Sequence, residues 1–209
     1  MKQLSCDGWP AGLALHPAAL KGRACAALLE DITAALRRAP FFTPTMPRWG
    51  RPFSVRMSNF GPLGWVSDKS GYRYQEVHPE TKAPWPPMPE GLLRLWDEFT
   101  GWPAPPQAAL INHYRPGARM GLHIDRDEED MRAPILSISL GCDALFRIGG
   151  PSRSGPTTSI RLRDGDILLM AGDSRRCYHG IDRIYPATGH LPDAMGEGRL
   201  NITLRRVTR

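Results

Sequence analysis

The feature that most constrains the fold is a series of short apolar segments in the second half of the chain. After Pro106 the sequence is divided by Gly, Pro and Asp into pieces of strand length. Short strands at this spacing are typical of a β-barrel or a β-sandwich. Strands are expected at residues 107–115, 119–124, 134–140, 144–149, 158–163, 166–171 and 199–207.

Two helices are expected before these strands, which makes the fold class α+β. Residues 17–38 begin with a proline and carry leucines and alanines near helical spacing, and Pro40 follows them. Residues 90–101 repeat the amphipathic pattern. The segment between Pro44 and Pro89 is rich in Gly, Pro and aromatic residues, with short extended pieces. A chain of 209 residues is long enough for one domain with a sizeable core.

Charge and cysteine content narrow the class of protein. The 27 basic and 21 acidic side chains give a net charge of +6, which favours a polyanionic partner such as nucleic acid. The sequence contains no signal peptide and no apolar run of membrane-spanning length, so a soluble cytoplasmic protein is expected. Its cysteines have no paired spacing and are interpreted as free thiols. They are Cys6, Cys25, Cys142 and Cys177.

A candidate metal site begins at His123-Ile124-Asp125. On a strand, residues i and i+2 share a face, so His123 and Asp125 could bind one ion together. His179 can supply a third ligand, and two imidazoles with one carboxylate match the facial triad of non-haem Fe(II) oxygenases. The alternative makes His123 a surface residue and Asp125 the start of an acidic run, 125–130. Cys177, two residues before His179, is a minor candidate ligand.

A second candidate site lies at the C-terminal strand. Its alternation places Arg199, Asn201 and Arg205 on one face and apolar residues on the other. Guanidinium groups suit bidentate binding of a carboxylate, so this face could bind an organic acid. The alternative is a solvated basic edge strand. Asn112 and Tyr114 share a face of an earlier strand and could hydrogen-bond the same acid.

Several motifs together resemble the AlkB family of Fe(II)- and 2-oxoglutarate-dependent dioxygenases. The resemblance covers roughly residues 50–209. It rests on the order and spacing of Gly64-Trp65, Gly71-Tyr72-Arg73-Tyr74, Lys82-Ala83-Pro84-Trp85, Asn112-x-Tyr114, Pro116-Gly117-Ala118, His123-x-Asp125-x-Asp127, Tyr178-His179-Gly180 and Arg199-x-Asn201-x-Thr203-x-Arg205. Several motifs in register are much less probable by accident than any one of them.

The resemblance implies a fold and a cofactor set. The fold would be a double-stranded β-helix (jelly roll) over residues 91–209, buttressed by N-terminal helices. Residues 1–45 would be a helical extension and residues 46–90 a nucleotide-recognition lid. Fe(II) would be held by His123, Asp125 and His179, with 2-oxoglutarate and O2 as co-substrates. His179 is preferred to His190 because Tyr178-His179-Gly180 matches the family pattern.

The same resemblance implies roles for the second site. Arg199 would bind the distal carboxylate of 2-oxoglutarate, helped by Asn112, Tyr114 and Asn201. Arg205 would lie near the other end of the co-substrate.

The implied activity is oxidative demethylation of N-alkylated bases such as 1-methyladenine and 3-methylcytosine. The substrate would be single- or double-stranded DNA, with RNA as a second candidate, and the enzyme would work as a monomer. The base must leave the stack and then needs an aromatic platform. The residues implied for binding it are Trp65, Tyr72, Tyr74, Asp127 and Arg153.

Several readings remain open at the level of sequence. Trp85 could be core or platform, and Arg175 and Arg176 could contact phosphate or be solvated. A 2-oxoglutarate dioxygenase acting on a protein or small molecule is one alternative function. A non-catalytic nucleic-acid-binding domain is another, although it should lack complete ligands. A zinc hydrolase could use the triad but would leave Arg199 and Arg205 without a role.

Overall fold

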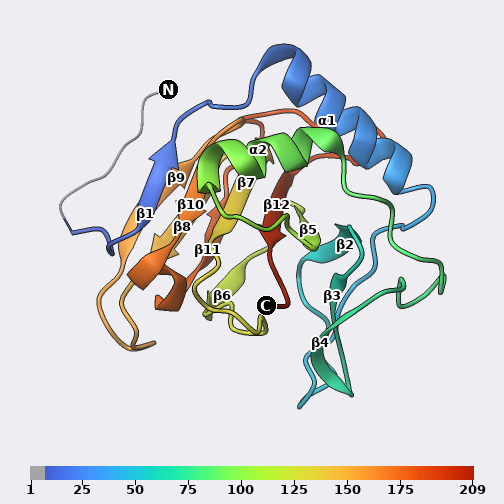
Figure 1. Ribbon diagram of the computed structural model, residues 1–209. Helices are drawn as coiled ribbons and strands as arrows, with labels where there is room; N and C mark the ends of the chain where they lie inside the picture. The colour runs from blue at the N-terminus through green and yellow to red at the C-terminus, as the bar shows by residue number, and fades with distance from the viewer. Residues whose placement is uncertain (1–7) are drawn as a thin grey trace.

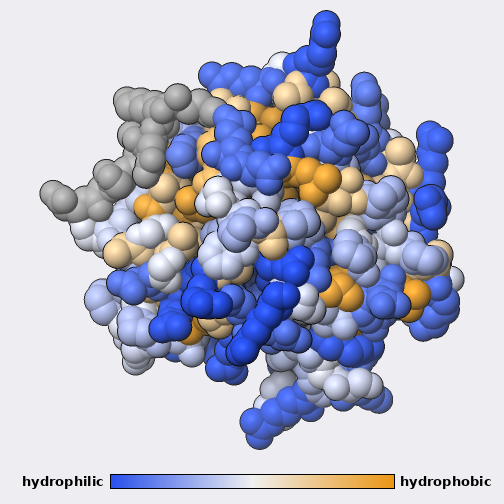
Figure 2. Space-filling model, in the orientation of Figure 1, coloured by the Kyte–Doolittle hydropathy of each residue, from blue (hydrophilic) through white to orange (hydrophobic). Residues whose placement is uncertain are grey.

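The computed structural model describes residues 8–209, so the free thiol expected at Cys6 lies outside the described residues. Antiparallel sheets of six and four strands make up the centre of the molecule, and a separate two-stranded hairpin stands beside them (Figure 1). Figure 2 shows hydrophilic residues over most of the visible face, where hydrophobic residues form only small separate patches.

The six-stranded sheet has the order β1-β10-β7-β12-β5-β2. Its central strands β7, β12 and β5 are almost completely buried, although β7 and β12 alternate apolar with polar residues. The strands are β1 (Leu13–His16), β2 (Arg56–Phe60), β5 (Ala108–Tyr114), β7 (Ile135–Gly141), β10 (Ile167–Met170) and β12 (Arg199–Arg205).

The four-stranded sheet has the order β6-β11-β8-β9, and the hairpin consists of β3 and β4. The bounds are β3 (Gly64–Asp68), β4 (Gly71–Gln75), β6 (Met120–His123), β8 (Ala144–Ile148), β9 (Thr158–Leu162) and β11 (His179–Ile184). Register shifts interrupt the pairing of β11 with both of its neighbours.

Two apolar clusters divide the molecule into layers. One fills the space between the two large sheets, where Leu168 and Met170 pack with Phe146 and Ile181. The other lies on the opposite face of the six-stranded sheet, under helices α1 (Gly22–Ala35) and α2 (Glu90–Thr100) (Figure 1). Because side chains alternate between the two faces of each strand, the six-stranded sheet contributes residues to both apolar clusters.

The helix expected at 90–101 is confirmed, but the one expected at 17–38 is shorter. It starts at Gly22 because the preceding residues are held in another conformation. Ala18 has a positive φ of 47°, and its amide donates to Asp166 Oδ1 at 2.8 Å. The Leu20 amide bonds to the carbonyl of Gly165 at 3.0 Å. Both partners belong to the Asp164–Asp166 turn between β9 and β10.

All seven expected strands are present, with ends shifted by a residue or two. Strands β1 and β11 and the β3–β4 hairpin were not predicted. Two further findings concern the cysteines and the length of the helices. Cys25, Cys142 and Cys177 are free thiols, as expected. Within residues 8–209, no helix is both long enough and apolar enough to cross a bilayer.

Candidate metal centre and carboxylate site

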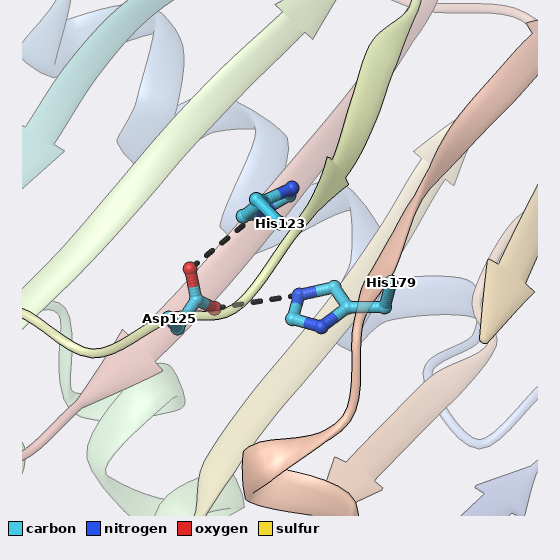
Figure 3. Close-up of side chains that lie close together, drawn as sticks. All are labelled: His123, Asp125 and His179. Carbon is cyan, nitrogen blue, oxygen red and sulfur yellow. Dashed lines mark ion pairs between the residues drawn. The ribbon is translucent and has the colours of Figure 1, made fainter. Parts of the chain in front are cut away.

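Three side chains converge where β6 meets β11 (Figure 3). His123 and His179 are register partners on these two strands, and their ring centroids are 4.6 Å apart. Asp125 lies between them, with its two oxygens each 3.6 Å from one histidine Nε2. One ligand atom from each residue lies within 4.8 Å of the others. The spacing suits a single metal ion bound by two nitrogens and one oxygen.

The expectation that His123 and Asp125 share one face of a strand is wrong. His123 is the last residue of β6, and Asp125 follows in a segment without regular structure. Strand alternation therefore does not place the two side chains together. The loop conformation does, so the contacts that hold this loop matter to the site.

Both imidazoles are oriented by main-chain carbonyls. The Nδ1 of His123 lies 2.9 Å from the Gly121 oxygen, and the Nδ1 of His179 lies 3.1 Å from the Cys177 oxygen. A carbonyl oxygen only accepts, so each Nδ1 carries the proton and each Nε2 keeps its lone pair. That is the tautomer a metal ligand needs.

The Asp125 carboxylate is buried among cations. Burial by itself raises its pKa, but Arg205 at 2.9 Å and the two neighbouring imidazoles hold that pKa well below its ordinary value. Asp125 in turn raises the pKa of His123 against the opposite effect of burial. The carboxylate is therefore ionised and ready to bind a cation.

Arg205 joins Asp125 to a second buried carboxylate. Its Nη1 lies 3.4 Å from Glu128, and the Tyr74 hydroxyl donates to the same Glu128 oxygen at 2.5 Å. The other Glu128 oxygen pairs with Arg175 at 3.0 Å, and both side chains are 1% exposed. The solvated or phosphate-contacting role considered for Arg175 is therefore wrong. Glu128 was also missed, because the sequence shows it only as part of an acidic run.

Arg199 is a buried guanidinium whose hydrogen-bond partners among the described residues are neutral. It is fully buried and donates to the Ser139 hydroxyl at 2.6 Å and weakly to the Cys142 carbonyl, while its Nε has no partner among the described residues. Burial lowers the pKa of Arg199 to about 10. Burial of an unpaired charge is costly, so this group is suited to an incoming anion.

The other predicted carboxylate ligands lie beside Arg199. Tyr114 is the register partner of Arg199, and Asn112 is the partner of Asn201. The Asn112 side-chain oxygen is buried without a partner, and Asn201 donates to the Ser137 hydroxyl at 2.7 Å. Because β12 is central in the sheet, the solvated edge-strand reading is wrong.

The hairpin carries a pair of stacked aromatic rings. Trp65 on β3 and Tyr72 on β4 have centroids 5.7 Å apart and planes 18° apart. Trp65 is 9% exposed and its indole nitrogen donates to Asp127 Oδ2 at 2.8 Å, whereas Tyr72 is 52% exposed. Three of the predicted base-binding residues, Trp65, Tyr72 and Asp127, are therefore in contact with one another. Asp127 lies two residues after Asp125 in the chain, which places this group near the candidate metal site.

Other candidates lie outside these clusters. Arg153 is exposed in the β8–β9 loop, and within residues 8–209 no hydrogen bond or ion pair joins it to the other site residues. His190 is exposed and is not in the convergent group, and the Cys177 sulfur contacts the Asp173 carbonyl instead. Trp85 is core, 4% exposed with its indole nitrogen bonded to Gln75.

Comparison with known proteins agrees with this geometry. Residues 12–205 match the model of the 2OG-Fe(II) oxygenase superfamily. The Alpha-ketoglutarate-dependent dioxygenase AlkB homolog of Caulobacter vibrioides is 49% identical over 93% of this chain and 87% of its own. Alpha-ketoglutarate-dependent dioxygenase AlkB of Escherichia coli is 40% identical over 86% of this chain and 83% of its own.

More distant relatives extend the comparison. The tRNA demethylase abh1 of Schizosaccharomyces pombe is 33% identical over 65% of this chain and 47% of its own. The solved structure of OsALKBH1 superposes with a TM-score of 0.78 at 26% identity, covering 98% of this chain and all of that one. The chain has the antiparallel 2OG-Fe(II) oxygenase fold, and it belongs to the AlkB family of Fe(II)- and 2-oxoglutarate-dependent dioxygenases.

Proposed function

We propose that this dioxygenase removes N-linked methyl groups from nucleobases of the 1-methyladenine and 3-methylcytosine type in DNA, with RNA as a second substrate. The observation that carries the proposal is the Trp65–Tyr72 stack tied to Asp127, two residues from Asp125. A stack whose outer ring, Tyr72, is half-exposed beside a candidate metal centre suits a flat substrate, and the net charge of +6 suits a polyanion.

The metal ligands in this proposal are His123, Asp125 and His179. Their fit to Fe(II) rests on the convergent Nε2 and carboxylate atoms and on the Nδ1 protons held by carbonyls. Bound Fe(II) and 2-oxoglutarate supply the O2 activation that hydroxylates a methyl group while the co-substrate loses carbon dioxide. The hydroxymethyl product falls apart to formaldehyde and the free base, so no protein nucleophile is needed.

The chain's own residues bind and orient the co-substrate. Arg199 binds the distal carboxylate of 2-oxoglutarate, which neutralises its buried charge. Asn112, Tyr114 and Asn201 line the same cradle, and Arg205 lies toward the metal end. The partnerless atoms of Arg199 and Asn112 are those such a ligand would satisfy.

The hairpin residues orient the base. An alkylated base leaves the stack at a cost of a few kcal/mol and regains about 1–3 kcal/mol by stacking on an aromatic ring. Trp65 and Tyr72 provide that platform, and His123 faces the base from the other side. The Asp127 carboxylate accepts from an exocyclic amino group or favours a cationic base. Tyr74 supports the pocket from β4.

Further parts of the proposal concern architecture and setting. The two large sheets would form a double-stranded β-helix over residues 91–209, with residues 46–90 as the nucleotide-recognition lid and 1–45 as a helical extension. The exposed Arg153 loop would reach the substrate strand. The enzyme would act as a cytoplasmic monomer.

The decisive experiment has two stages. Anaerobic titration with Fe(II) and 2-oxoglutarate is followed by aerobic incubation with a 3-methylcytosine oligonucleotide and a formaldehyde assay. The unmethylated oligonucleotide is the control. Formaldehyde from the methylated strand alone supports the proposal. Cofactor binding without formaldehyde would remove the nucleobase and favour a protein or small-molecule substrate.

A further inference from the structure

Arg175 is a buried cation outside the proposed ligand set. It belongs to the 3-10 helix η1 (Gly172–Arg176) and is 1% exposed, whereas its neighbour Arg176 is exposed. Burying a guanidinium is costly unless its donors are satisfied. The contacts of Arg175 therefore show what the chain gains from burying it.

Those contacts all lie in one stretch of chain, residues 125–133. The Arg175 Nη1 donates to the main-chain carbonyl of Asp125 at 2.8 Å, and its Nε donates to the carbonyl of Ala133 at 3.0 Å. Its Nη2 pairs with Glu128 at 3.0 Å. The planar fork of arginine can reach three such points at once, which the single ammonium group of lysine cannot do in the same geometry.

The held stretch lacks regular secondary structure, so no strand ladder fixes Asp125. Arg175 itself precedes His179 by four residues in the chain. One side chain thus connects the segment that carries Asp125 to the segment that leads into His179. Its bond to the Asp125 carbonyl acts on the backbone, independently of the Arg205 contact with the Asp125 carboxylate.

We propose that Arg175 is a positioning residue that sets the placement of Asp125 relative to His179, and hence the metal affinity of the centre. The inference rests on the proposed metal site and adds a residue to it that does not touch the metal. Glu128 is the counter-charge that allows the guanidinium to be buried at this place.

Co(II) binding to the apoprotein is the test, with the dissociation constant and the visible absorption spectrum as readouts. Arg175→Lys keeps the charge and the pairing with Glu128 but loses the carbonyl contacts. We expect its Co(II) dissociation constant to rise at least tenfold, with an altered ligand-field spectrum, as is typical when contacts behind a metal ligand are removed. Arg176→Lys, the matched control at the exposed neighbour, should bind Co(II) as the wild type does.

A second variant separates positioning from stability. Arg175→Met combined with Glu128→Gln removes both buried charges, so neither is left unpaired. We expect the folded apoprotein to show weakened Co(II) binding in this variant too. Wild-type Co(II) affinity and spectrum in both variants would overturn the inference, and so would loss of folding in both, which would make Arg175 purely structural. Failure of the wild type to bind Co(II) would instead count against the proposed metal site.

Discussion

At the residue scale, the third ligand is the sharpest assignment. His179 faces Asp125 from β11, whereas His190 is exposed and outside the convergent group. His179→Ala should therefore abolish iron-dependent turnover, and His190→Ala should leave it unchanged. Single-turnover formaldehyde release measures both, and the reverse pattern would overturn the assignment.

Replacing Arg199 should weaken the binding of 2-oxoglutarate but stabilise the folded apoprotein. Arg199→Met should raise the KM for 2-oxoglutarate by about tenfold to a hundredfold, because a charge-assisted pair is lost. The same change should raise the Tm of the apoprotein, because it removes an unpaired buried charge. Steady-state kinetics and thermal unfolding check the two effects.

The matched control is Arg206→Met, on the same C-terminal segment, where Arg206 bonds only to main-chain carbonyls. It should leave the KM unchanged. An Arg199→Met variant with wild-type KM would contradict the carboxylate-binding role.

At the scale of elements, the pairing of β2 with β5 carries a pH dependence. Burial and the charges of Arg56 and Arg115 lower the pKa of His113 to about 4. The Arg56 guanidinium donates to His113 Nδ1 at 2.8 Å, which requires neutral imidazole. Between that pKa and the ordinary value of 6.5, His113 is protonated in the unfolded chain but neutral in the folded chain.

The contribution of His113 to the free energy of unfolding, on the order of 2 kcal/mol, should therefore be fully present above pH 6.5 and be lost as the pH falls toward 4. His113→Asn keeps an acceptor for Arg56 without a proton to gain. Urea unfolding between pH 7 and 4.5 should show a shallower loss in that variant. Equal pH profiles would contradict the role of His113.

The same scale shows what could be predicted from sequence. The central strands were found because apolar residues recur at least at every second position, as in residues 135–141. Strand β11 was missed because Gly180, Asp182 and Arg183 separate its two isoleucines from any regular apolar pattern, and because it is bulged against both neighbours. The early start given to α1 failed because Asp166, far along the chain, fixes Ala18. Such long-range contacts leave no local signal.

The candidate site was predicted in a similar way. Residues of the candidate metal and carboxylate sites have chemical types that identify them, so His123, His179 and Arg199 could be named. Glu128 and Arg175 form a buried contact with each other although they lie 47 positions apart in the sequence. Glutamate and arginine are also ordinary residues on a protein surface, so neither stands out in the sequence. Only the fold shows that they are inside.

At the scale of the whole molecule, the positive charge and the buried centre should respond differently to salt. Affinity for a methylated oligonucleotide should fall steeply as salt rises from about 50 to 200 mM, because phosphate contacts release counterions. The KM for 2-oxoglutarate should change much less, because Arg199 is fully buried. Fluorescence anisotropy and kinetics test this pair. Oligonucleotide affinity that ignores salt would contradict an electrostatic interface.

The whole account depends on one ion held where β6, β11 and the loop after His123 meet. Equilibrium titration of the anaerobic apoprotein with Fe(II) tests this most directly, with wild type compared with the double variant His123→Ala and His179→Ala. The account predicts one Fe(II) per wild-type chain and loss of that site in the double variant. Undiminished Fe(II) binding by a folded double variant would contradict it.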